Sequence, residues 1–87
     1  MVEEYRDAYQ NAQHYNDKIN IIVSLIQHVS EAERIIQAQK INNLRELIRR
    51  LDSLDYEPRQ EAIMNIHTQL DAIFNEALDS LEQQRSR

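Results

Sequence analysis

The chain has 87 residues, a net charge of −5 from 15 acidic and 10 basic side chains, one proline, and neither glycine nor cysteine. This composition excludes glycine-rich phosphate loops, disulfide staples and thiolate metal clusters, and it leaves few means of forming tight turns. We therefore expect an all-α protein that forms a single helical domain over residues 1–87.

The first predicted helix spans residues 2–29. Its apolar side chains recur at alternating spacings of three and four residues, which is the pattern of a heptad seam. The members of this seam are Tyr5, Ala8, Ala12, Tyr15, Ile19, Ile22, Ile26 and Val29. The seam fails after Val29, so we expect the helix to end there.

The second predicted helix spans residues 30–53. Ser30 and Glu33 have the spacing of a capping box, in which the serine oxygen accepts a hydrogen bond from the amide of residue 33. A new apolar seam, shifted by one residue from the first, consists of Ile41, Leu44, Ile48 and Leu51. A turn at Ser30 absorbs this shift; a continuous helix with a stutter is the alternative.

The third predicted helix spans residues 58–84. Pro58 fits the first turn of a helix and disfavours helical backbone at Glu57. The seam that follows consists of Ile63, Ile66, Leu70, Ile73 and Ala77. The turn between the second and third helices is therefore predicted just before Pro58.

Three helices of similar length favour an antiparallel three-helix bundle with up-down-up connections. This arrangement would bring Tyr5 and Tyr9 close to Tyr56. A long helical hairpin completed by dimerisation is the alternative architecture. A chain this short buries a limited core and has no staple, so we expect it to self-associate, as a dimer of identical chains.

Each predicted helix carries apolar residues beyond its seam. Such residues either widen the core or form an exposed patch, and exposed patches on small proteins mark contacts with other chains. Tyrosine is also favoured at interfaces. The candidate interface residues are Tyr5, Tyr9, Leu25, Leu47, Phe74 and Leu78.

A basic cluster lies in the second predicted helix and consists of Arg45, Arg49 and Arg50. Arg45 and Arg49 are one turn apart and repel each other unless an anion lies over them. Glu46 and Asp52 are close enough in sequence to supply that anion internally. Otherwise the cluster is a candidate contact for an acidic partner or for phosphate.

The histidines and serines give no pattern typical of catalysis or metal binding. No two of His14, His28 and His67 are three or four residues apart, and the Glu-x-x-His spacing of di-iron bundles is absent. A nucleophile needs a neighbouring base and an oxyanion pocket, which commonly forms at a glycine-bearing turn. We therefore expect no enzyme activity, no metal and no cofactor.

We interpret the chain as a small non-catalytic protein–protein interaction module of the adaptor, chaperone or regulator type. The alternative is a nucleic-acid-associated protein that uses the basic face of the second helix, and steep salt dependence would identify it. The sequence shows neither a secretion signal nor an apolar stretch approaching the roughly 20 residues that span a bilayer. These features favour a cytoplasmic location, or the cytosol of a host cell, without membrane contact.

Overall fold

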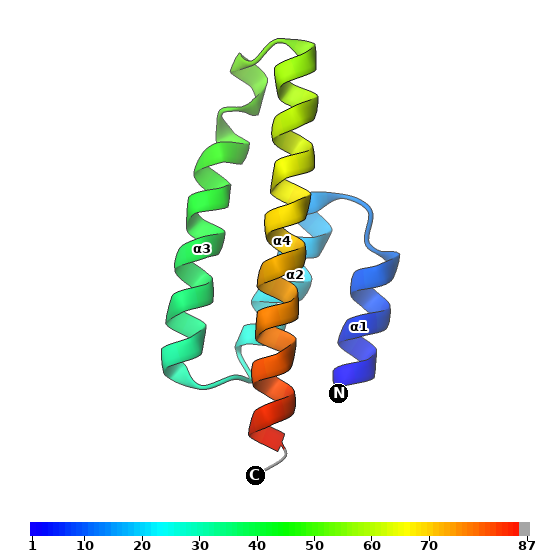
Figure 1. The fold of residues 1–87 in the computed structure, drawn as a ribbon, viewed down its shortest axis with the longest axis vertical. Helices are drawn as coiled ribbons and strands as arrows, with labels where there is room; N and C mark the ends of the chain where they lie inside the picture. The colour runs from blue at the N-terminus through cyan, green and yellow to red at the C-terminus, as the bar shows by residue number, and fades with distance from the viewer. Residues whose placement is uncertain (86–87) are drawn as a thin grey trace.

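The computed structural model describes residues 1–85 and has an all-α fold, as the sequence predicts (Figure 1). Within these residues the α-helices are α1 (Val2–Asn11), α2 (Tyr15–Ile26), α3 (Glu31–Arg49) and α4 (Tyr56–Arg85), and a short 3₁₀ helix, η1 (Leu51–Ser53), joins α3 to α4. The described chain therefore has four α-helices, and the predicted three-helix bundle is not confirmed.

The predicted helix over residues 2–29 is divided into α1 and α2, which is the largest difference from the sequence prediction. α1 ends at Asn11, and Ala12 has extended backbone with φ −78° and ψ 125°. His14 caps α2, because its ring Nδ1 accepts a hydrogen bond from the Asn16 amide at 3.1 Å. No glycine or proline marks this break.

α1 folds back along α2 and α4 instead of continuing the axis of α2 (Figure 1). Tyr5 contacts Ser24, near the C-terminal end of α2, and Tyr9 stacks on Phe74 of α4. Tyr56 begins α4 at the opposite end of the molecule. The prediction that Tyr5 and Tyr9 lie beside Tyr56 is therefore wrong, because the chain reverses between α1 and α2.

The predicted boundary at Ser30 is confirmed. α2 ends at Ile26, and the Ser30 hydroxyl caps α3 by accepting a hydrogen bond from the Glu33 amide at 3.3 Å. The Glu33 carboxylate accepts a hydrogen bond from the Gln37 side chain at 2.8 Å. The serine thus satisfies one of the amides that the first turn of α3 leaves without a helical partner.

The second predicted boundary lies two residues from the observed one. α4 begins at Tyr56 instead of at Pro58, so that the proline occupies its first turn. Proline lacks an amide hydrogen, but it is tolerated there because amides in the first turn have no helical acceptor. Glu57 is therefore helical, contrary to the expectation that the following proline would keep it out of the helix.

One apolar core joins the helices, and α4 packs against the other three. Its largest fully buried apolar side chains are Ile22, Leu25, Ile66 and Leu70. α1 contributes one buried residue, Tyr9, whereas α4 contributes seven. The core is therefore formed mainly by α2, α3 and α4, and α1 is peripheral.

α3 and α4 form a long hairpin that α1 and α2 cover only in its lower half (Figure 1). The molecule measures 48 × 26 × 15 Å along its principal axes. The first residue of α2, Tyr15, meets His67 of α4 with ring centroids 6.2 Å apart. The part of α4 before His67 consequently has no α2 beside it. We call the hairpin over residues 45–66 the hairpin end.

Candidate functional site

The six candidate interface residues do not form a surface. Four of them are at most 9% exposed and belong to the core of a single chain, namely Tyr9, Leu25, Phe74 and Leu78. Tyr5 and Leu47 are half-buried against the same core. A second chain could reach the four buried side chains only after the first chain opened.

The position of α1 explains the burial of Tyr9 and Phe74. The Tyr9 ring stacks on Phe74, with ring centroids 4.0 Å apart and planes 7° apart. The Tyr9 hydroxyl donates a 2.5 Å hydrogen bond to Asp71, and the Lys18 ammonium group donates to the same carboxylate oxygen at 3.2 Å. Burial and the Asp71 carboxylate raise the pKa of Tyr9, so the hydroxyl stays neutral and donates. A continuous first helix would leave this face of α4 open, which is why the sequence pattern places Phe74 at an interface.

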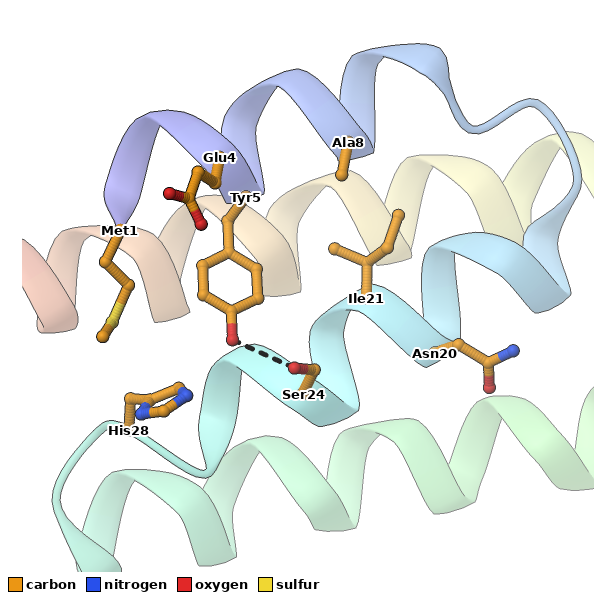
Figure 2. A pocket seen from close by; sticks show the side chains of 8 residues that line it. All are labelled: Met1, Glu4, Tyr5, Ala8, Asn20, Ile21, Ser24 and His28. Carbon is orange, nitrogen blue, oxygen red and sulfur yellow. Dashed lines mark hydrogen bonds between the residues drawn. The ribbon is translucent and has the colours of Figure 1, made fainter.

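A pocket of about 490 Å³ lies between α1 and α2 (Figure 2). Ala8 and Ile21 form part of its wall, and the hydroxyl groups of Tyr5 and Ser24 share a 3.0 Å hydrogen bond. The His28 ring lies near Tyr5, with ring centroids 6.1 Å apart. Ser24 thus pairs with another hydroxyl group instead of with a base, which is not the arrangement that activates a nucleophile. We interpret this pocket as the open side of the contact between α1 and α2.

The hairpin end carries an apolar stripe that continues beyond its cover. Ile63 lies three residues before Ile66, and Tyr56 lies seven residues before Ile63, so all three share one side of α4. Ile66 is 0% exposed, whereas Ile63 is half-buried and Tyr56 is 71% exposed. Ile48 of α3 and Leu54 of the connection are also half-buried against the core. The stripe loses its cover beyond Tyr15, the first residue of α2.

Arginine side chains border this stripe. The three candidate anion contacts, Arg45, Arg49 and Arg50, are exposed, and Arg49 forms an ion pair with Glu46. Arg59 of α4 donates a hydrogen bond to a backbone carbonyl at 2.9 Å, but its buried Nε has no partner among the described residues. A carboxylate brought to the hairpin end would find guanidinium donors available.

Tyr56, Arg59 and Ile63 are not among the site residues that the sequence predicts. Their spacing of three and four residues leads into Ile66 and extends the third seam toward the N-terminus, which is the signal that could have identified them. In the predicted bundle a continuous first helix covers this end of the hairpin. The uncovered surface becomes visible only once α1 is known to fold back.

The histidines have local roles in packing. His14 caps α2, and the His67 ring lies against Tyr15. Burial and the neighbouring Lys18 ammonium group lower the pKa of His67. Among residues 1–85, no three histidine, aspartate or glutamate side chains are grouped so that they could hold a metal ion.

Comparisons of the chain with protein-family models, with curated proteins and with solved structures find no match. Within the described residues, no helix combines the length and the apolar character needed to cross a membrane. Functional inference therefore depends on the geometry and charge of the hairpin end.

Proposed function

We propose that this protein is a protein–protein interaction module whose hairpin end binds an acidic, amphipathic helix of a partner protein. The observation that carries the proposal is the stretch of the α3–α4 hairpin that extends past the start of α2 at Tyr15. Beside Ile66 and Leu70, α2 supplies the third helix of the core. Beyond them that third helix is missing, and a partner helix would supply it.

The dimensions of the uncovered stretch suit a short helix. The part of α4 over residues 56–66 is about 16 Å long at 1.5 Å per residue, so about three helical turns would cover it. Half-buried Ile48 and Ile63 and the exposed Tyr56 supply an apolar floor. An amphipathic helix binds such a floor through side chains at heptad spacing, and tyrosine is a frequent anchor at interfaces.

The two arginines beside the apolar floor favour carboxylates on a partner helix, although the hairpin end as a whole has four arginines against five carboxylates. Arg45 lies three residues before Ile48, and Arg59 lies four residues before Ile63, so both guanidinium groups border the floor. Glu61 lies two positions before Ile63, about 200° around the helix, and therefore faces the other side of α4. Carboxylates on a partner helix could pair with the guanidinium groups of Arg45 and Arg59.

A pair of designed peptides tests the proposal. The probe is an amphipathic helix of about 15 residues with leucine on one face and glutamate on both flanks, and the control peptide has lysine in place of glutamate. We expect only the acidic peptide to shift the NMR amide signals of isotope-labelled protein, and only within residues 45–66. No binding, signal changes elsewhere, or equal binding of the lysine peptide would contradict the proposal.

Two variants separate the apolar and the charged contributions to this binding. Ile63→Asp should abolish binding, provided that circular dichroism shows intact helices. Arg45 is exposed, so Arg45→Glu should leave the fold intact and shift the preference toward the lysine peptide. An unchanged preference in Arg45→Glu would show that charge does not select the partner.

Nucleic-acid binding through Arg45, Arg49 and Arg50 is the alternative function. The exposure of these side chains supports it, whereas the net charge of −5 and the ion pair between Arg49 and Glu46 weaken it. Oligonucleotide binding that falls steeply between about 50 and 200 mM salt would support this alternative. Helix docking onto an apolar floor should depend much less on salt.

Self-association is a second proposal, and the exposed pair Ile35 and Ile36 favours it. These side chains are 61% and 50% exposed on α3, with the exposed, uncharged Ala32 and Gln39 one turn away. Two copies paired through this face would bury four half-exposed isoleucines, each contributing about 1 kcal/mol. This gain of about 4 kcal/mol does no more than offset an association cost of at least about 4 kcal/mol, so we expect a dimer through this face only at high protein concentration.

Sedimentation equilibrium tests the dimer. We expect the mass to rise above the 10.4 kDa of one chain as the protein concentration increases, and Ile35→Glu to restore the monomer. A mass of one chain at every concentration would contradict self-association. A dimer that persists in Ile35→Glu would show that another face is responsible.

A further inference from the structure

We propose that α1 is a built-in competitor for the hairpin end: it leaves its place beside α4, continues α2 as one straight helix, and covers the surface that a partner helix would occupy. This inference rests on the proposed function, because it concerns the regulation of that same binding site. In the conformation described above, α1 is folded back and the hairpin end is open.

The apolar pattern passes through the break between α1 and α2 without a change of register. Tyr5, Ala8, Ala12, Tyr15 and Ile19 follow one another at spacings of three, four, three and four residues. Tyr15 and Ile19 contact the core, so in a straight helix the three earlier residues would lie on the same side, toward the hairpin end. The folded-back position uses this register only in part, because Ala8 is exposed and Tyr5 is half-buried.

The break contains no residue that prevents a helix. Ala12 and Gln13 have high helix propensity, and neither glycine nor proline occurs there. His14 caps α2 through a single hydrogen bond of 3.1 Å from the Asn16 amide. Straightening would replace this cap with continuous helical hydrogen bonds. Contacts made by α1, and not the local preference of the break, therefore hold the folded-back position.

Those contacts are concentrated at Tyr9, the one buried residue of α1. Its ring stacks on Phe74 and its hydroxyl bonds to Asp71. Pockets of about 490 Å³ and 460 Å³ lie on the α2 side and on the α4 side of α1. The ion pair between Arg6 and Glu82, at 2.9 Å, joins side chains that are 39% and 46% exposed, and such pairs contribute little. Besides Tyr9, the apolar side chains of α1 that pack against the core are the half-buried Val2 and Tyr5.

The hairpin end offers α1 a second position of matching length, with one favourable charge pair and with Glu3 opposed by Asp55. α1 has ten residues and is about 15 Å long, close to the length of the uncovered part of α4. α2 and α4 run in the same direction, and Tyr15 meets His67. A straight helix would therefore bring Asp7 level with Arg59, whose buried Nε has no partner within the described residues. α1 is also acidic, because it carries Glu3, Glu4 and Asp7 against Arg6.

Electron spin resonance can distinguish the two positions of α1. The chain has no cysteine, so spin labels attach only at the introduced Glu4→Cys and Gln60→Cys, both at exposed positions. In the folded-back position the start of α1 lies beside Glu82, and the labels are about 30 Å apart along α4. In the straight position they are about 15 Å apart or closer. We expect wild-type protein to show both distances. The proposal would be overturned if wild type and all the variants described next showed only the long distance.

Two matched pairs of variants test the cause of the short distance. Gln13→Pro should abolish it, because proline disrupts a helix interior and the extended Ala12 suits the residue before a proline. Gln13→Ala should retain it. Asp71→Ala removes the acceptor of the Tyr9 hydroxyl and should increase the short-distance population several-fold. Asp79 lines the same pocket as Asp71, so Asp79→Ala is the control and should leave the populations unchanged. The proposal would be overturned if the two variants of either pair gave the same short-distance population.

Failure of this inference and failure of the proposed function give different results. If the acidic peptide binds the hairpin end but the labels stay about 30 Å apart even in Asp71→Ala, α1 does not compete and only the inference is wrong. If the short distance appears but the peptide does not bind Gln13→Pro, the proposed partner site is wrong. A short distance that disappears on dilution with unlabelled protein would show α1 reaching a second copy, which also overturns competition within one chain.

Discussion

Gln37 is 1% exposed, the one polar side chain that the core of the described residues encloses. Its amide nitrogen donates hydrogen bonds to Glu33 at 2.8 Å and to Glu76 at 2.9 Å. Its Oε1 has no hydrogen-bond partner in this part of the chain. A buried acceptor without a partner costs about 1 to 3 kcal/mol, so Gln37 destabilises the core at this atom.

Gln37→Leu should therefore raise the free energy of unfolding by about 1 kcal/mol, because it removes the unpaired oxygen while Glu76 keeps its pairing with Lys40. Urea denaturation measures the change. Gln39→Leu, on the exposed side of α3, is the control and should change stability little. If Gln37→Leu lowers the free energy of unfolding instead, the hydrogen bonds from the Gln37 amide to Glu33 and Glu76 stabilise the protein more than the unpaired oxygen destabilises it.

The cap of α3 gives a second prediction for a single side chain. Ser30→Ala should lower the free energy of unfolding by about 1 kcal/mol, because the Glu33 amide loses its acceptor. Ser80→Ala, in the interior of α4, should have a smaller effect, and chemical denaturation of both variants makes the comparison. Equal effects would mean that the Ser30 hydroxyl does not stabilise the helix.

His67 predicts a dependence of stability on pH. Its pKa is lowered by burial and by Lys18, with His14 acting in the same direction and Asp71 opposing them. The unfolded chain therefore binds a proton more readily than the folded protein, so this contribution to stability is complete above the ordinary pKa of 6.5 and is lost as the pH falls below it. Between about pH 7.5 and 5.5, the Tm of wild type should fall further than that of His67→Gln. Equal falls would contradict this assignment.

At the level of helices, the boundaries that depend on local chemistry could be predicted from sequence. Ser30 accepts a hydrogen bond from an amide three residues away, and Pro58 restricts its own backbone. The break at Ala12 could not be predicted, because it depends on Tyr9 reaching Phe74 near the other end of the chain. Local pattern favours a continuous helix there, and this tertiary contact overrides it.

The candidate site was predictable to the same extent. Arg45, Arg49 and Arg50 could be singled out because they are neighbours in sequence, and their binding of an anion or acidic partner stays a prediction. Tyr56 and Ile63 could not, because the predicted bundle covers them with the first helix. The missed break therefore accounts for the burial of Tyr9 and Phe74 and for the overlooked hairpin end.

Because the hairpin end has no third helix, we expect the amides of α4 to be protected unevenly from hydrogen exchange. Amides of residues 60–65 should exchange with solvent faster than those of residues 70–77, because two helices alone bury less apolar surface than three. Hydrogen exchange followed by NMR gives the comparison, and the acidic peptide should slow exchange within residues 60–65. Equal protection along α4 without peptide would mean that the hairpin end is as stable as the covered half.

For the molecule as a whole, the proposals imply that α1 has two alternative positions along the α3–α4 hairpin. The hairpin is too long for α1 to cover both parts at once. With α1 folded back, the face around Phe74 is covered and the stripe around Ile63 is open. With α1 straight, the stripe is covered and the face around Phe74 is open. The partner helix and α1 then compete for one surface, and the fraction of open molecules sets the apparent affinity.

The dissociation constant of the acidic peptide for Gln13→Pro and for Gln13→Ala tests this competition most directly. Gln13→Pro keeps α1 folded back and the hairpin end open, whereas Gln13→Ala favours the straight helix that covers it. Isothermal titration calorimetry should give a dissociation constant at least about three-fold lower for Gln13→Pro than for Gln13→Ala, with wild type between them. Equal dissociation constants, or no binding to Gln13→Pro, would contradict a docking surface that α1 controls.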